Sequence, residues 1–155
     1  MKLRVETQID ICAPAPAVWF ALMDFDRHPD WNPFVRSIHG VPKPGTRLQV
    51  QVQAPGSSGM TFRPVVLSNR ENQEFSWLGR LLVPGLFDGE HYFRLEPLGP
   101  LHTRLIHGEL FSGLLARLAH KGLTGATRQG FEAMNLALKQ RVEAADQDIA
   151  PRHLL

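Results

Sequence analysis

Residues 86–111 read LFDGEHYFRLEPLGPLHTRLIHGELF, and this stretch decides the fold. It holds two segments, about 86–97 and 101–111, in which apolar and polar residues alternate. Alternation with a period of two is the pattern of a strand that buries one face. The loop PLGPL between the segments is short and contains glycine and proline, so the two strands are predicted to form an antiparallel hairpin.

The hairpin brings three titratable side chains together. A turn centred on Gly99 places His91 opposite His107 and Gly89 opposite Glu109. Because side chains two residues apart share one face of a sheet, the two histidines and the glutamate are predicted to form one polar cluster on the inner face. A slip of one residue would turn two arginines inward instead, which is much more costly.

After the hairpin the apolar period becomes helical. Apolar residues and one asparagine recur in steps of three and four, which predicts a long amphipathic helix with the stripe Phe131, Met134, Asn135, Leu138, Val142 and Ala145. Asn135 interrupts this stripe and needs a buried partner or a ligand. Gly122, Gly125 and Gly130 weaken the first half, so we expect a bend or break near residues 121–126. Residues 147–155 are expected to form a frayed tail.

Before the hairpin, the first elements are a strand and two short helical segments. Residues 3–12 alternate, which predicts a strand whose inner face carries Val5, Thr7, Ile9 and Ile11. Pro14 and Pro16 suit the first turn of a helix over residues 15–24. Residues 26–35, DRHPDWNPFV, contain two prolines and are expected to form a second short helical turn and a packed connection.

Further strands are predicted between these helices and the hairpin. Residues 46–54 alternate, and the cluster APGSSG after them is a turn. Two further same-face series follow, Met60, Phe62, Pro64 and Val66, and then Phe75, Trp77 and Gly79. Residues 35–111 therefore predict an antiparallel meander. The whole order of elements is α+β, with one sheet large enough to curl around the final helix, in a single domain over residues 1–146.

Several of these segments together resemble a known superfamily. They are AVWFALMDFDRHPDWNPFV (17–35), FSWLGR (75–80), GEHYFRLEP (89–97), TRLIHGELFSG (103–113) and GFEAMNLALKQR (130–141). In this order they resemble the polyketide cyclase/dehydrase branch of the START-like superfamily, also called SRPBCC, over about residues 3–145. The resemblance implies a helix-grip fold, in which a curved antiparallel sheet of about seven strands wraps around the long C-terminal helix. It also implies a deep cavity for lipids, sterols, polyketides or other apolar molecules.

Composition narrows the class of protein. Of 155 residues, 43% are hydrophobic and 21% charged, which is typical of a globular protein. Lys and Arg number 17 and Asp and Glu 15, for a net charge of +2, and the basic residues are spread singly, so we expect no nucleic-acid partner. Cys12 is the only cysteine, which excludes an intrachain disulfide. No segment has the roughly 20 apolar residues of a membrane span, and we expect a cytoplasmic protein without integral membrane association.

Four interpretations of the His91, His107 and Glu109 cluster stay open. The three side chains can satisfy one another as a structural network. They can orient a ligand in an apolar cavity. They can act as general acid and base, since a buried carboxyl beside an imidazole has its pKa moved toward neutrality. They can also ligate zinc, although the resemblance implies no metal and we expect neither metal nor cofactor.

Two functional hypotheses follow, one of binding and one of catalysis. The first is a binder or carrier of a hydrophobic small molecule, such as a lipid, quinone, polyketide or aromatic compound. Its expected contacts are Met60, Phe62, Trp77, His91, Phe93, His107, Glu109, Met134, Asn135 and Leu138. The second is an enzyme of the cyclase, aromatase or dehydratase type, in which His91, His107 and Glu109 are catalytic. An interaction module with a vestigial cavity is a third class, which nothing in the composition favours.

Two further residues have competing interpretations. Trp31 could gate the cavity or pack under the second short helix. Cys12 stands at a strand end without a neighbouring histidine or acid in the sequence, which argues against a nucleophilic role.

Overall fold

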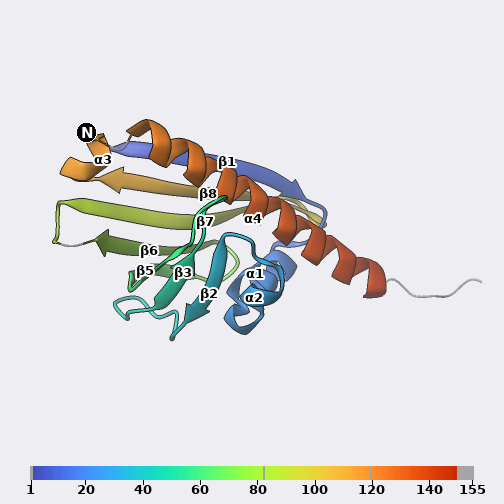
Figure 1. The fold of residues 1–155 in the computed structure, drawn as a ribbon. Helices are drawn as coiled ribbons and strands as arrows, with labels where there is room; N and C mark the ends of the chain where they lie inside the picture. The colour runs from blue at the N-terminus through green and yellow to red at the C-terminus, as the bar shows by residue number, and fades with distance from the viewer. Residues whose placement is uncertain (1, 82, 119, 150–155) are drawn as a thin grey trace, which may run out of the picture.

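The computed structural model describes residues 2–81, 83–118 and 120–149, and Figure 1 shows its ribbon. In chain order the elements are β1 (Leu3–Ile11), α1 (Ala15–Met23), the 3-10 helix η1 (Phe25–Arg27), α2 (His28–Trp31), β2 (Val35–His39), β3 (Gln49–Val52), β4 (Met60–Phe62), β5 (Val65–Arg70), β6 (Glu74–Leu81), β7 (Phe87–Gly99), β8 (His102–Ser112), α3 (Leu114–Leu118) and α4 (His120–Ile149). The predicted α+β class is confirmed.

The strands of the described residues form two antiparallel sheets. The larger has the order β1-β8-β7-β6-β5 and the smaller the order β2-β3-β4, with a bridge between Arg47 and Val65 connecting them. The series from Met60 to Val66 therefore divides between the sheets. Pro64 lies at the division, where a residue without an N–H cannot continue a ladder. Helix α4 lies across β1 and β8 in Figure 1, as a helix-grip fold requires.

The central hairpin of β7 and β8 has a register two residues away from the predicted one. His91 lies opposite Glu109 and Phe93 opposite His107, so the predicted pairing of His91 with His107 is wrong. The turn falls at residues 100–101, and the ladder is irregular between Pro97 and Gly99. A shift of two residues leaves every side chain on its predicted face, because the side-chain period of a strand is two.

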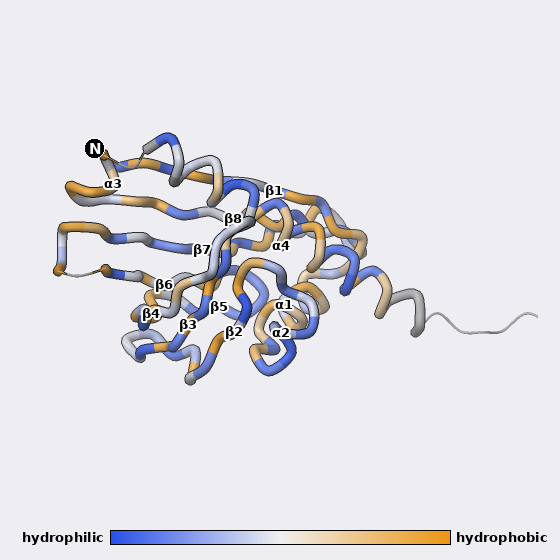
Figure 2. The backbone as a smooth tube through the Cα atoms, viewed as in Figure 1, coloured by the Kyte–Doolittle hydropathy of each residue, from blue (hydrophilic) through white to orange (hydrophobic). Residues whose placement is uncertain are grey.

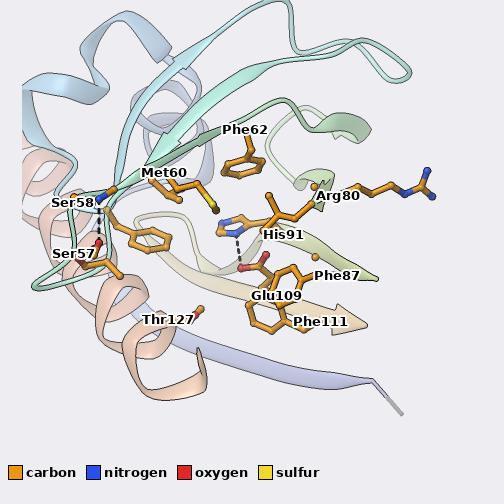
Figure 3. Close-up of a pocket in the computed structure, with 17 residues that line it drawn as sticks. Ser57, Ser58, Met60, Phe62, Arg80, Phe87, His91, Glu109, Phe111 and Thr127 are labelled. Atoms are coloured by element: carbon orange, nitrogen blue, oxygen red, sulfur yellow. Dashed lines mark hydrogen bonds and ion pairs between the residues drawn. The ribbon is translucent and has the colours of Figure 1, made fainter. Parts of the chain in front are cut away.

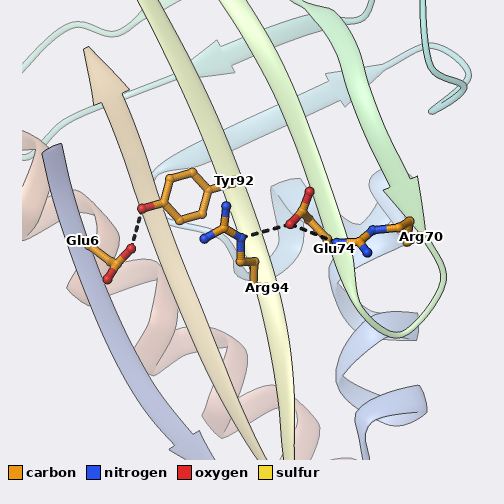
Figure 4. Close-up of polar contacts among 5 residues, drawn as sticks. All are labelled: Glu6, Arg70, Glu74, Tyr92 and Arg94. Carbon is orange, nitrogen blue, oxygen red and sulfur yellow. Dashed lines mark hydrogen bonds and ion pairs between the residues drawn. The ribbon is translucent and has the colours of Figure 1, made fainter. Parts of the chain in front are cut away.

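The outer face of the large sheet carries the residues that a one-residue slip would have buried. Tyr92 lies over Gly108 of the neighbouring strand and donates a hydrogen bond to Glu6 Oε2. The Arg94 guanidinium lies 4.4 Å from the centre of the Tyr92 ring and bonds Glu74 at 2.9 Å. Figure 4 shows this row of polar contacts running across the strands. The residues that were predicted to point inward therefore lie on the opposite, inner face of the sheet.

Helix α4 covers the inner face. Its stripe Phe131, Met134, Asn135, Leu138 and Val142 is buried, whereas Ala145 is exposed. Figure 2 shows hydrophobic and hydrophilic residues mixed along α4 and β1, each of which has one buried face. A bend or a break was predicted near residues 121–126; the helix continues through them, so the break is wrong, and the bend stays a prediction. It also continues to Ile149, and the rest of the expected tail, 150–155, lies outside the described residues.

The helical segments after β1 are locked by a buried polar pair. Asn32 Oδ1 accepts hydrogen bonds from the backbone N–H groups of Phe34 and Val35, at 3.0 and 2.9 Å. Its amide nitrogen donates to His28 Nδ1 at 3.2 Å, and His28 Nε2 donates to the Leu22 carbonyl at 2.7 Å. The motif WNPFV therefore has a structural explanation, because Asn32 turns the chain from α2 into β2.

Candidate functional site

A cavity of about 360 Å³ lies between the two sheets, toward the end where β6 passes into β7. Four phenylalanines line it, Phe34, Phe62, Phe87 and Phe111, together with Thr127 of α4. The loop after β3, from Ser57 to Gly59, and the half-exposed Met60 also line it. The lining is mostly apolar, so the cavity suits a hydrophobic molecule.

Glu109 and His91 are the two titratable side chains of the large sheet's inner face that line this cavity. Figure 3 shows His91 between Met60 and Phe62 on one side and Glu109 and Phe111 on the other. Glu109 Oε2 lies 3.5 Å from His91 Nδ1, and 18% of the Glu109 side chain is exposed. The predicted cluster is therefore assembled at the cavity, although only two of its three members line it.

The third member, His107, continues the polar contacts away from the cavity into the core. His91 Nε2 and His107 Nε2 are 2.9 Å apart, and His107 Nδ1 lies 2.8 Å from Asn135 Oδ1. The Asn135 amide donates to Thr7 Oγ1 at 2.9 Å, and the Thr7 hydroxyl donates to the His107 carbonyl at 3.1 Å. We call this series from Glu109 to Thr7 the polar chain. It supplies the buried partner that Asn135 was predicted to need.

Burial sets the charge of the polar chain. It lowers the pKa of His91 to about 3 and raises the pKa of Glu109 to about 8, because each charged form would lose its hydration. Burial likewise lowers the pKa of His107 well below its usual range, with a further contribution from neighbouring His91. At pH 7 both imidazoles are therefore neutral and the Glu109 carboxyl is mainly protonated.

Aromatic rings hold both imidazoles in place. Trp77 stacks on His91 with 4.6 Å between ring centres and 8° between planes. Phe131 stacks on His107 with 3.9 Å between centres. Phe93 contacts both imidazoles, at 4.9 and 4.5 Å between ring centres. The polar chain thus has few rotamers available, and its hydrogen bonds are preorganised.

The structure divides the predicted ligand contacts into two groups. Met60, Phe62, His91 and Glu109 line the cavity. The others lie outside its lining and are buried in the core behind it, namely Trp77, Phe93, His107, Met134, Asn135 and Leu138.

Sequence reasoning missed several lining residues. Phe111 and Phe87 share the strand parity of Glu109 and His91, so the period of two could have found them. Thr127 lies four residues before Phe131, so the helical period could have found it, whereas Phe34 comes from the end of a loop and no pattern in the sequence points to it.

The remaining residues singled out in the sequence lie elsewhere. Trp31 packs on His28 with 5.0 Å between ring centres and does not line the cavity. Of its two interpretations, gating and packing, this position agrees with packing. Cys12 is exposed and also lies outside the lining.

Two features of the described residues concern metals and membranes. The ranges 2–81, 83–118 and 120–149 contain no group of three or more His, Cys, Asp or Glu side chains arranged to hold a metal ion. The facing nitrogens of His91 and His107 are already at hydrogen-bond distance. Within the same ranges no helix is both long and apolar enough to cross a bilayer.

Solved structures with the same fold span nearly the whole chain. A START superfamily protein from Mycobacterium smegmatis superposes with a TM-score of 0.74 at 21% identity, over 92% of this chain and 98% of that one. The Zhui aromatase/cyclase from a Streptomyces species gives 0.72 at 17% identity, over 94% and 96%. A norcoclaurine synthase mutant from Thalictrum, bound to a transition-state analogue, gives 0.70 at 12%, over 94% and 97%. At these identities the likeness concerns the fold alone.

The sequence itself also matches a family. No curated protein matches the chain. The family described as polyketide cyclase / dehydrase and lipid transport matches residues 2–143. The match covers the sheets, the cavity lining and most of α4, so the resemblance noted in the sequence is confirmed. The chain belongs to the polyketide cyclase / dehydrase and lipid transport family.

Proposed function

We propose that the protein binds a compact hydrophobic small molecule in the cavity, with the body of the ligand among the phenylalanines and one polar group at Glu109. The observation that carries the proposal is the apolar wall with the Glu109 and His91 side chains in contact on one side of it. Apolar walls supply affinity and a few polar groups supply orientation in small-molecule sites. The membership of the chain in a family of cyclases, dehydrases and lipid transporters supports it.

The size of the cavity limits the ligand. Its volume of about 360 Å³ lies at the lower end of the roughly 300–1,000 Å³ common for ligand sites. A molecule of two or three fused rings suits this volume better than a long-chain phospholipid. The four phenylalanines present flat apolar surfaces, which favour an aromatic body through edge-to-face or offset contacts.

A fluorescent probe tests the binding site. N-phenyl-1-naphthylamine is neutral and apolar, and its emission rises when it leaves water. We expect saturable binding that weakens about tenfold or more in Met60→Trp, because the larger ring occupies the rim of the cavity. Leu67→Trp is the matched control, since Leu67 is 43% exposed against 44% for Met60 but does not line the cavity. Absence of binding, or equal loss in both variants, would contradict the proposal.

Catalysis is the second candidate, and the polar chain is the observation that favours it. A neutral Glu109 with a pKa of about 8 can give up or receive a proton near pH 7. His91, which burial keeps neutral, holds the Glu109 carboxyl in position through Nδ1, while the cavity orders a flexible substrate. The enzyme would then be of the cyclase, aromatase or dehydratase type. Turnover of a polyketide substrate that survives Glu109→Gln, His91→Ala and His107→Ala would refute these roles.

A further inference from the structure

The direction of the polar chain can be worked out from its fixed end, the His107 backbone carbonyl. A carbonyl oxygen only accepts, so the Thr7 hydroxyl must donate to it. The Thr7 oxygen is then left to accept, and it accepts from the amide nitrogen of Asn135. The oxygen of Asn135 consequently points to His107 Nδ1, which must carry a proton in order to donate.

Both histidines continue the polar chain in the same direction. A neutral His107 with its proton on Nδ1 has an accepting Nε2, so His91 must donate to it from its own Nε2. A neutral His91 then has an accepting Nδ1, which faces Glu109 Oε2. At 3.5 Å the contact with Glu109 Oε2 is longer than the other hydrogen bonds of the polar chain, but the lone pair of an accepting nitrogen repels a carboxylate and attracts a protonated oxygen. The geometry therefore favours a proton on Glu109 Oε2 and leaves Oε1 as a carbonyl-type acceptor.

Ionisation of Glu109 would disrupt this arrangement. A carboxylate needs a donor from His91 Nδ1, and a neutral His91 with that proton would turn a lone pair toward the lone pair of His107 Nε2 at 2.9 Å. The alternative is to charge a buried imidazole, which burial opposes. Thr7 and Asn135 therefore influence the proton of a side chain that neither of them touches.

Few other charges face Glu109 among the described residues. On β1 the residue opposite is Val5, and α4 contributes Thr127 to the cavity. On β6 the exposed Arg80 stands at the rim, with Asp88 of β7 at 3.8 Å from it. His91 is thus the titratable group in direct contact with the Glu109 carboxyl, and its state is tied to the polar chain.

We propose that Thr7 and Asn135 fix the direction of the polar chain, so that Glu109 presents a neutral carboxyl with an accepting Oε1 and selects a ligand that carries a hydroxyl donor. This inference rests on the proposed binding function. It names the ligand class as neutral aromatic alcohols, phenols or enols. An ether of the same size offers no proton to Oε1, and an anionic carboxylate would meet an acceptor in a poorly hydrated site.

The direction of the hydrogen bonds in the polar chain can be tested without any ligand. We would follow the side-chain carboxyl carbon of Glu109 by NMR through a pH titration. Thr7→Val frees Asn135 to rotate and donate to His107, which reverses the direction of the hydrogen bonds in the polar chain. An ionised Glu109 is then allowed, so the pKa of Glu109 should fall by about one unit or more. Asn135→Leu should act in the same direction. Thr103→Val is the matched control. Thr103 also donates a hydrogen bond to a buried carbonyl, that of Ala13, but it is not part of the polar chain.

Ligand selection is tested with three naphthalenes by calorimetry at about pH 6.5, where Glu109 is protonated. We expect 2-naphthol to bind about tenfold more tightly than 2-methoxynaphthalene or 2-naphthoate. Glu109→Gln should keep this preference, since its amide can donate to His91 and its oxygen can accept. Glu109→Leu should lose it.

The outcomes separate the two proposals. Equal binding of the three naphthalenes overturns the ligand selection and leaves hydrophobic binding intact. Binding of none of them contradicts both the proposed function for this ligand class and the selection. If the Glu109 pKa is the same in Thr7→Val, Asn135→Leu and Thr103→Val, the proposed direction of the polar chain is wrong, whatever the result of the ligand-binding measurements.

Discussion

Gly89 lies so close to Glu109 that a Cβ atom on Gly89 would overlap the Oε1 atom of the carboxyl. The absence of a side chain on β7 at this point makes the room that Glu109 occupies on β8. Gly89→Ala should displace the carboxyl, weaken probe binding and lower the free energy of unfolding by about 1–3 kcal/mol. Gly99→Ala on the same strand is the control, because a Cβ there meets nothing within 4 Å. Urea denaturation of both variants measures the difference, and equal stabilities would argue against the contact.

Two glycines of α4 should respond to alanine in opposite directions. A Cβ on Gly130 would overlap the ring of Phe34, so Gly130→Ala should destabilise the protein by about 1–3 kcal/mol. Gly125 has open space around the same position, and Gly125→Ala should stabilise the helix by up to about 1 kcal/mol. Thermal unfolding measures both. A stabilising Gly130→Ala would show that Phe34 does not pack on the helix as described.

The protonation of Glu109 should be visible in the pH dependence of stability. Its pKa is about 8 in the folded chain, against an ordinary 4.5, so between these values the folded state holds a proton that the unfolded state has lost. Stability from this group therefore falls as the pH rises from about 4.5 to 8.

Glu109→Gln cannot lose that proton, so the stability of this variant relative to the native protein should rise across this window, by about 4 kcal/mol in total. The lowered pKa values of His91 and His107 act in the opposite sense, because they remove stability as the pH falls below about 6.5, and they are common to both proteins. Urea denaturation at about pH 5 and pH 8.5 makes the comparison. A difference that does not change with pH would rule out a protonated Glu109.

Asn32 should be among the most sensitive polar positions outside the cavity. Asn32→Ala leaves the N–H groups of Phe34 and Val35 and the His28 ring without their partner, and we expect a loss of about 2–4 kcal/mol. Asn69→Ala is the control, since Asn69 donates one hydrogen bond, to the Pro42 carbonyl, and should cost about 1 kcal/mol. Equal losses in the two variants would contradict the role of Asn32 in the turn into β2.

Strand parity explains how much of the site could be predicted. The period of two placed His91, His107 and Glu109 on one face, and this survived a register error of two residues because such a shift preserves the face. The alternation does not determine which residues face each other across the hairpin, because the turn fixes that pairing. The loop PLGPL turns at residues 100–101, whereas a centre on Gly99 was predicted.

The position of the cavity could not be read from periodicity. Trp77 and Phe93 share the face of Glu109, but the rings of His91 and His107 lie against them. Phe131 of α4 packs on both histidines, so this part of the face belongs to the core. The empty space lies further along the sheet, where β4 and the loop after β3 form the other wall. The alternation of residues shows which face of a strand is buried, whereas the spacing between the two sheets and α4 decides where a void remains.

The most direct test of the account is a crystal structure of the protein with 2-naphthol. We expect the naphthalene ring between Phe62 and Phe111, with the hydroxyl within hydrogen-bond distance of Glu109 Oε1. A cavity closed by side chains, or a naphthol bound elsewhere with Glu109 turned to bulk solvent, would contradict the account.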